Sequence, residues 1–129
     1  MQQVVLDSDI IIDFTRGANT LLSSLFHQAS QKYIRIFVPS VVVAELMAGQ
    51  ETKKHEQLEN LEQLFNTVEF IDMNYEISKV TGFLVRDFPV TVTLADAIVA
   101  ASALTMKAKL ATRNKKHFSQ IPGLSFYKF

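Results

Sequence analysis

Hydrophobic residues follow two alternating spacings along the chain, one typical of buried strands and the other typical of amphipathic helices. Short apolar runs predict strands at residues 3–6, 33–38, 68–71 and 110–112, with an edge strand at 125–127. Helical spacing predicts a short turn at 10–14 and helices at about 21–29, 40–45, 58–65, 77–84 and 94–107. Asn19 or Thr20 is expected to cap the helix at 21–29, and Thr93 the helix at 94–107.

This alternation predicts an α/β fold, a three-layer α/β/α sandwich with a central, mainly parallel sheet of about four or five strands. A chain of 129 residues, 48% of them hydrophobic, is long enough for one cooperative core, so we expect a single domain over residues 1–129. The chain has no Cys, which excludes disulfide bonds, thiolate zinc sites and a cysteine nucleophile.

Acidic and amide side chains stand where apolar runs end. Asp7 follows the first predicted strand, Glu45 lies in the helix after the second, Asp96 opens the helix before the fourth, and Asn114 follows the fourth. Sites in parallel α/β sheets form beyond the carboxyl ends of the strands, so these four residues are expected to meet at one rim. Carboxylates set among apolar residues need a partner, and Mg²⁺ or Mn²⁺ is the shared cation that hard oxygen ligands favour.

Each of these residues also has a purely structural interpretation, and the sequence leaves it open. Asp7 or Asp9 is suited to cap the helical turn that begins near residue 10. Asp96, three residues after a capping Thr, is suited to complete a variant capping box. Asn114 is typical of a turn, and Glu45 is compatible with an ordinary surface position.

The charges are distributed unevenly although the formal net charge is zero. Residues 97–129 contain six basic residues and no acidic one, and residues 1–96 contain 7 basic and 13 acidic residues. Such asymmetry favours a polyanionic partner, and a solvated helix end and loop explains it equally well. Arg113, Lys115 and Lys116 follow the fourth predicted strand and so lie on the same rim, and His117 is expected to be exposed to solvent next to Phe118.

The longest apolar run, around residues 97–104, is far shorter than the roughly 18 residues of a membrane span. The N-terminal residues have neither a basic start nor a long apolar stretch. We therefore expect a soluble cytoplasmic protein without a membrane partner.

Four sequence motifs, taken in order, resemble those of one enzyme family. They are LDSDIIID at residues 6–13, VAEL at 43–46 with Gly49 after it, LADAIVAASA at 94–103, and ATRNKKHF at 111–118 with PGL at 122–124. Each motif is loose alone, but together they resemble the PIN-domain nucleases, and among these the small VapC-type toxins of toxin–antitoxin pairs. The resemblance covers nearly the whole chain.

The resemblance implies a metal-dependent endoribonuclease that uses Mg²⁺ or Mn²⁺. Asp7, Glu45 and Asp96 match the family's acidic metal-site residues, and Asn114 falls where an acid, Asn or Ser usually stands. We expect water to attack the phosphorus in line and to leave a 5′-phosphate and a 3′-hydroxyl.

Two further pocket residues follow from the same resemblance. Ser8 occupies the place of a small hydroxyl residue that orders the pocket. The neutral Asn114 leaves a second metal ion with fewer anionic ligands, so a second metal position is expected to be weak. Asp9 stands where many relatives have Asn, and its charge is expected to replace the one missing at Asn114.

The partners that the resemblance implies are an RNA substrate, an antitoxin of the VapB type and a second copy of the chain in a homodimer. Arg113, Lys115 and Lys116 are expected to hold the RNA backbone at the rim. An antitoxin of this class typically inserts a basic side chain into the acidic pocket. The apolar stripe of residues 50–65 is a candidate surface for the antitoxin or the second copy, and helical spacing of this kind is also typical of a core.

Three other functions remain open from the sequence. A haloacid-dehalogenase-like phosphatase also begins with a strand and Asp-x-Asp, with Asp7 as nucleophile and Asp9 as general acid, but Ile11 stands where Thr or Val is expected. A receiver domain would use Asp72, after the third strand, as phosphoacceptor, and leaves Glu45 unexplained. A PIN-like binding module without catalysis is the third alternative.

Overall fold

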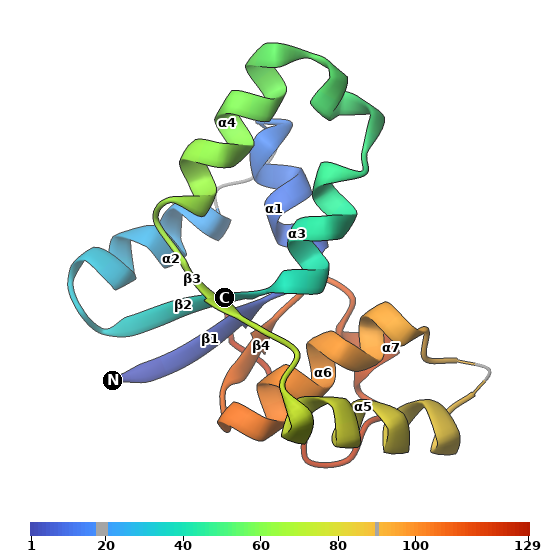
Figure 1. Ribbon diagram of the computed structural model, residues 1–129. Helices are drawn as coiled ribbons and strands as arrows, with labels where there is room; N and C mark the ends of the chain where they lie inside the picture. Colours follow the sequence, from blue (N-terminus) through green and yellow to red (C-terminus); the bar gives the residue numbers. More distant parts are fainter. Residues whose placement is uncertain (18–20, 90) are drawn as a thin grey trace.

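A parallel sheet of four strands forms the centre of this computed structural model, which describes residues 1–17, 21–89 and 91–129 (Figure 1). The strands are β1 (Gln2–Leu6), β2 (Ile34–Pro39), β3 (Glu69–Ile71) and β4 (Lys109–Ala111). Their order is β3-β2-β1-β4, and all three pairings are parallel. The predicted capping of the second helix by Asn19 or Thr20 lies outside the described residues.

Helices cover both faces of this sheet. They are α1 (Ser8–Thr15), α2 (Leu21–Ser30), α3 (Ser40–Met47), the 3₁₀ turn η1 (Gln50–Lys53), α4 (His55–Phe65), α5 (Tyr75–Asp87), α6 (Leu94–Met106) and α7 (Lys115–Phe118). Figure 1 shows α5 and α6 together on one side of the sheet and α1, α2 and α4 on the other. The predicted three-layer α/β/α architecture is confirmed.

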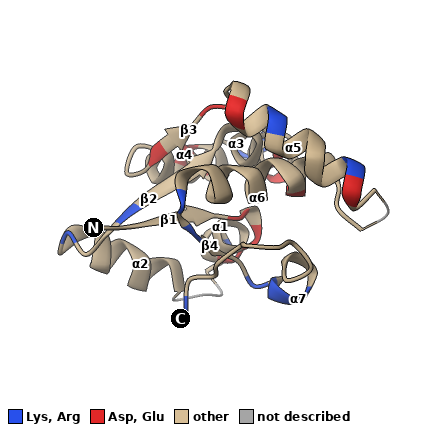
Figure 2. Cartoon of the chain, turned by 90° about the horizontal axis from the view of Figure 1, so that it is seen from below, with Lys and Arg blue, Asp and Glu red and all other residues tan. Residues whose placement is uncertain are grey.

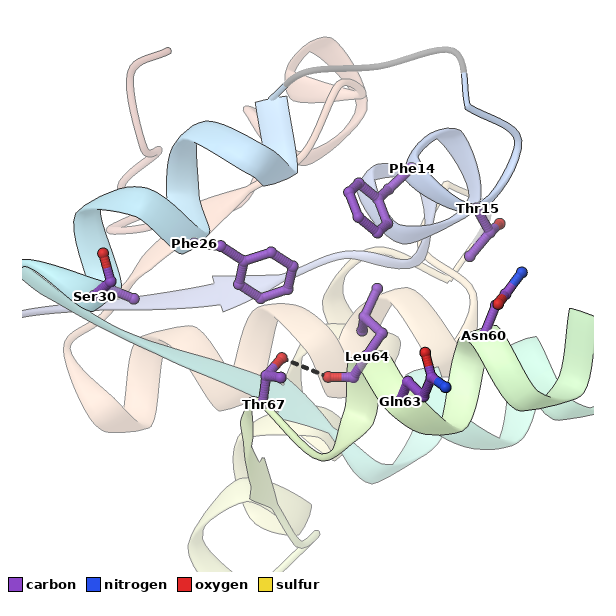
Figure 3. Close-up of a pocket in the computed structure, with 9 residues that line it drawn as sticks. Phe14, Thr15, Phe26, Ser30, Asn60, Gln63, Leu64 and Thr67 are labelled. Carbon is purple, nitrogen blue, oxygen red and sulfur yellow. Dashed lines mark hydrogen bonds between the residues drawn. The ribbon is translucent and has the colours of Figure 1, made fainter.

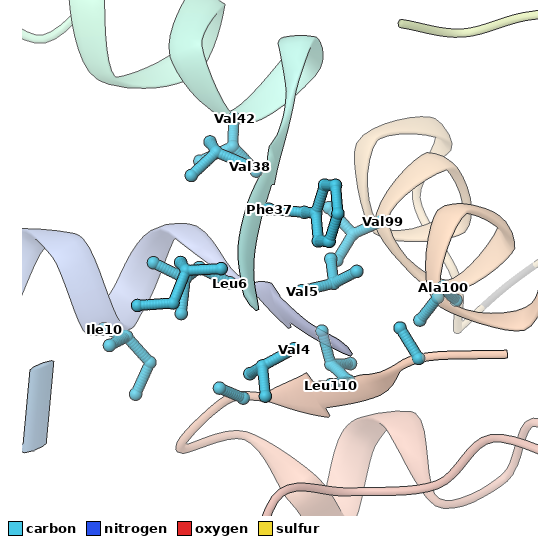
Figure 4. Close-up of a cluster of buried hydrophobic side chains, with 14 of the residues drawn as sticks. Val4, Val5, Leu6, Ile10, Phe37, Val38, Val42, Val99, Ala100 and Leu110 are labelled. Carbon is cyan, nitrogen blue, oxygen red and sulfur yellow. The ribbon is translucent and has the colours of Figure 1, made fainter. Parts of the chain in front are cut away.

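Side chains of β1 alternate between these two helical layers, because successive residues of a strand point to opposite faces. Figure 4 shows Val5 turned toward Val99 of α6, and Leu6 turned toward Ile10 of α1. Val5, Leu6 and Ile10 are completely buried. Each such side chain contributes about 1.5–3 kcal/mol of burial free energy, which fixes the central strand and therefore the residues that follow it.

The last long helix, α6, begins and ends as the sequence predicts. The Thr93 hydroxyl accepts a hydrogen bond from the Asp96 backbone N–H at 3.1 Å, which caps the helix. Lys107 ends it in the left-handed conformation, with φ of 55°. Alanines at 97, 100, 101 and 103 are buried, so this helix packs closely on the sheet and fixes the position of Asp96.

Two sequence predictions differ from the structure, and one short helix was not predicted. The predicted edge strand at 125–127 is reduced to one bridge, between Leu110 and Phe126, although two backbone hydrogen bonds of 2.9 Å still cover the outer edge of β4 there. Helix α1 begins earlier than predicted, at Ser8, because Asp7 caps it. The four-residue helix α7 was not predicted, since one turn is too short to show a hydrophobic period.

The apolar stripe of residues 50–65 is mainly core. Leu61, Leu64 and Phe65 of α4 are buried, so the stripe does not offer a flat exposed surface to a partner. None of the described helices is long and apolar enough to span a bilayer.

Candidate functional site

Asp7 leaves the end of β1 and is the most enclosed acid of the site, with only 7% of its surface exposed. Its Oδ1 atom accepts a hydrogen bond from the Ser8 backbone N–H at 2.8 Å, and its Oδ2 atom accepts one from the Thr112 hydroxyl at 2.9 Å. Burial raises the pKa of Asp7 to about 6, with smaller contributions in the same direction from the charges of Asp9 and Asp96. Asp7 therefore caps helix α1, as the sequence suggested for Asp7 or Asp9, and its negative charge is destabilised by burial.

Thr112 is a site residue that the sequence reasoning missed. It lies just after β4 and is 1% exposed. Its hydroxyl donates to Asp7 and accepts the Asn114 backbone N–H at 3.0 Å. The only signal in the sequence was a polar residue at the end of a short apolar strand, and its partner lies 105 positions away.

Asp9 lies in the first turn of α1, beside Asp7. Its Oδ2 atom accepts a hydrogen bond from the Arg113 backbone N–H at 3.0 Å, and burial raises its pKa. Its Oδ1 atom is buried and has no hydrogen-bond partner within the described part of the chain. An unsatisfied buried carboxylate oxygen is costly for the fold and marks a place where a cation would be stabilising.

Asp96 and Glu45, from two other helices, join Asp7 and Asp9 in what we call the acidic group. Glu45 lies on α3, where it is exposed and not enclosed as its apolar neighbours suggested. Partial desolvation raises its pKa, and the charge of Asp96 raises it further. Since Asp96 also raises the pKa of Asp7, the three acids that the sequence predicted at the rim share one electrostatic field.

These carboxylates fit a divalent cation by their chemistry more than by their present geometry. Oxygen ligands of this type suit Mg²⁺ and Mn²⁺, and one ion would offset both the burial and the mutual repulsion that raise the pKa values of Asp7 and Glu45. Within residues 1–17, 21–89 and 91–129, no group of three His, Asp or Glu side chains is already arranged to hold a metal ion. Binding of one ion by all three acids would therefore require their side chains to rearrange.

His117 contacts the acidic group, which corrects the expectation that it would be exposed. Its Nε2 atom lies 3.0 Å from Oδ2 of Asp96, and its ring packs edge-on against Phe118 with centroids 5.4 Å apart. The sequence could not show this contact because the two residues belong to different helices, 21 positions apart.

The predicted basic residues lie beside the acids but differ in their contacts. Arg113 forms an ion pair with Asp13 of α1, with Nε and Oδ2 2.6 Å apart. Lys115 and Lys116 are exposed and form no ion pair with any described residue. Figure 2 shows the blue basic segment of α7 on the surface. Asn114, also exposed, begins this helix without a side-chain capping bond.

An open groove lies beyond the far end of α1, between α1, α2 and α4 (Figure 3). Its volume is about 750 Å³. Phe14, Phe26 and Leu64 converge in it, and the first two rings meet edge to face with centroids 6.0 Å apart. Polar residues line the groove as well, among them Asn60 and Gln63 of α4. Because α1 has eight residues, this groove begins about 12 Å from the acids at its other end.

The sheet order disfavours a receiver domain. β2 lies between β1 and β3, so Asp72 beyond β3 is separated from Asp7 by a strand. Its carboxylate instead accepts a hydrogen bond from the Ser40 hydroxyl at 2.9 Å. The receiver alternative, in which these two aspartates act together, is therefore wrong for this fold.

The fold and the site together indicate an α/β protein with an acidic site beyond the carboxyl edge of its parallel sheet. The sequence profile identifies its family. The chain belongs to the PIN domain family, whose profile matches residues 4–124. It is 29% identical to ribonuclease VapC19 of Mycobacterium tuberculosis over 126 residues, which covers 93% of this chain and 95% of that protein.

Solved structures share this fold. The fold matches VapBC2 of Rickettsia felis bound to a promoter DNA fragment, with a TM-score of 0.86 at 24% identity over 99% of both chains. A toxin–antitoxin complex from Klebsiella pneumoniae matches at 26% identity with a TM-score of 0.70, over 98% of this chain and 99% of that one.

Proposed function

We propose that this chain is a metal-dependent endoribonuclease, the toxin of a VapBC-type toxin–antitoxin pair, acting on RNA in the cytoplasm as one domain over residues 1–129. The observation that carries the proposal is the electrostatic coupling of Asp96 to both Asp7 and Glu45, three acids supplied by different elements of a PIN fold. The ribonuclease names of its relatives support the choice of RNA as substrate.

Asp7, Glu45 and Asp96 are assigned as the ligands of a divalent ion, with Mg²⁺ or Mn²⁺ as the candidates. Asn114 is assigned to the same site as a neutral residue. Dependence on such an ion is typical of PIN nucleases, and a bound ion would offset phosphoryl charge and promote ionisation of the attacking water.

The chain itself supplies the positions of these groups. The Ser8 N–H and the Thr112 hydroxyl hold the two oxygens of Asp7, and Asp9 receives the N–H of Arg113. Lys115 and Lys116 lie on the same rim, where their charge is suited to hold the RNA backbone on either side of the cut. In-line attack by water predicts products with a 5′-phosphate and a 3′-hydroxyl.

We assign the groove between α1, α2 and α4 to the antitoxin. Its apolar walls suit an amphipathic helix. A segment that continued from the groove along α1 would reach the acids within about 12 Å, where a basic side chain would compete with the metal. The relatives solved as toxin–antitoxin complexes support such a partner. A homodimer remains part of the proposal.

The test compares cleavage of a defined RNA by the wild-type chain, Glu45→Gln and Glu62→Gln, with Mg²⁺, Mn²⁺ or EDTA. Loss of one ligand is expected to lower the rate about 100-fold or more, and EDTA to abolish it. Glu62 lies on the exposed face of α4, so its variant controls for the loss of a surface charge. Equal cleavage by the wild type and Glu45→Gln, or 2′,3′-cyclic phosphate ends, would contradict the proposal.

A further inference from the structure

The contact between His117 and Asp96 joins the unpredicted helix α7 to the acidic group. Nε2 of His117 lies 3.0 Å from Oδ2 of Asp96, and the two side chains are 26% and 32% exposed. A carboxylate accepts hydrogen bonds and does not donate them, so the proton lies on Nε2 and points at Asp96. The contact is therefore directional and partly shielded from water.

His117 is itself held in place from several sides. Its ring meets the ring of Phe118 at 77°, and Phe118 is 1% exposed, so it anchors α7 in the core. The backbone carbonyl of His117 accepts a hydrogen bond from Gln120 Nε2 at 2.9 Å. Gln120 Oε1 in turn accepts one from the Thr91 hydroxyl at 2.7 Å, two residues before the cap of α6. These contacts tie α7 to the start of the helix that carries Asp96.

The charge of Asp96 acts on both Asp7 and Glu45, so its orientation affects both of the other acids. The bond from His117 occupies Oδ2, and no other described residue makes a hydrogen bond to this carboxylate. One oxygen is thus fixed and the other is left for a ligand.

We propose that His117 is a positioning residue, which fixes the carboxylate of Asp96 through Nε2 so that its second oxygen can serve a divalent ion shared with Asp7 and Glu45. The inference rests on the proposed function, because it assigns a role toward the same metal site. Hydrogen-bond donors behind metal ligands set ligand orientation, and their loss typically weakens metal affinity 10–100-fold. His117 touches neither the ion nor the RNA in this role.

The experiment measures Mn²⁺ binding by calorimetry, without RNA, for the wild type and three variants. His117→Ala removes the donor, His117→Gln places an amide N–H near the position of Nε2, and His117→Asn carries an amide that is one bond too short. The matched control is His55→Ala, since the side chain of His55 is 92% exposed and lies on α4. Melting temperatures in EDTA report any purely structural effect.

We expect His117→Ala and His117→Asn to weaken Mn²⁺ binding 10–100-fold, and His117→Gln to restore it close to the wild-type value. The Mn²⁺ concentration needed for half-maximal RNA cleavage is expected to rise by the same factor, with the KM for RNA unchanged. If His117→Ala does not fold, the comparison of the Asn and Gln variants decides.

Two results would overturn the inference. Unchanged Mn²⁺ affinity in both the Ala and Asn variants would show that Asp96 needs no such support, and tighter binding would show that His117 competes with the ion. In either case an active wild type would leave the proposed ribonuclease intact. A wild type that neither binds Mn²⁺ nor cleaves RNA would overturn the proposed function and this inference together.

Discussion

Among the individual residues, Asp7 has the clearest features of a functional group. Two hydrogen bonds stabilise its charge, yet burial and neighbouring acids still raise its pKa from 3.8 to about 6. The folded chain thus binds this proton more tightly than the unfolded chain. Stability from this residue is lost as the pH rises from about 4 to about 6, and the penalty, about 3 kcal/mol, is complete at pH 7.

We therefore predict that Asp7→Asn raises the free energy of unfolding at pH 7 in EDTA by about 1–3 kcal/mol. Asn is also a good helix cap, and its amide can donate to the Thr112 hydroxyl. Urea denaturation at pH 5, 6, 7 and 8 checks this, with the gain largest at pH 7–8 and smaller at pH 5. Mg²⁺ is expected to stabilise the wild type and not the variant.

Asp72→Asn is the control for this measurement, because Asp72 is an exposed acid at the far edge of the sheet. It should show no comparable gain. A variant Asp7→Asn that is less stable than the wild type at pH 7 in EDTA would show that the charge of Asp7 is well accommodated without a cation.

The sequence placed the acids but not the groups that orient them, for a physical reason. Asp7 and Asp96 adjoin apolar runs whose burial fixes a strand and a helix, so local pattern is enough to locate them. Thr112 and His117 matter through contacts across 105 and 21 positions. Such contacts depend on how the helices and strands pack together, and the spacing of hydrophobic residues in the sequence does not predict them.

Two contacts of Arg113 hold the loop from β4 to α7 against α1. Its backbone N–H donates to Asp9 at 3.0 Å, and its side chain pairs with Asp13 at 2.6 Å. The side chain of Asp13 is only 15% exposed, which makes this ion pair better shielded than most surface pairs. The structure thus gives Arg113 a fastening role besides the predicted contact with RNA.

Because Arg113 has a structural role and Lys115 is proposed to contact RNA, Lys115→Ala and Arg113→Ala are expected to have different effects. Loss of Lys115 should weaken RNA binding and reduce the salt slope by about 0.7, because one phosphate contact is lost. Loss of Arg113 should mainly destabilise the fold, by about 0.5–1 kcal/mol. Binding of a short single-stranded RNA to Glu45→Gln protein at 50–200 mM salt measures the first effect, and urea denaturation measures the second.

The opposite pattern would reassign these residues. A salt slope that falls with Arg113→Ala and stays constant with Lys115→Ala would mean that the guanidinium leaves Asp13 to bind phosphate. Unchanged affinity for both variants at every salt concentration would remove α7 from the RNA site.

The acidic site and the apolar groove lie at opposite ends of α1. The acids adjoin its first residue, and Phe14 and Thr15 at its end line the groove. A substitution in the groove can therefore block binding of an antitoxin helix without altering the acids. This separation allows catalysis and inhibition to be tested independently.

We predict that Ala29→Trp abolishes binding of the antitoxin and preserves RNA cleavage. Ala29 lies on α2 in the wall of the groove, so a large side chain there would fill space that a helix needs, whereas Ser24→Trp on the exposed face of α2 would not. The measurement is co-purification of each variant with a co-expressed antitoxin of the VapB type, together with cleavage assays of each free variant. Capture that survives Ala29→Trp and fails with Ser24→Trp would place the antitoxin on the outer face of α2. Loss of cleavage in Ala29→Trp alone would mean that the groove and the acidic site are coupled through α1.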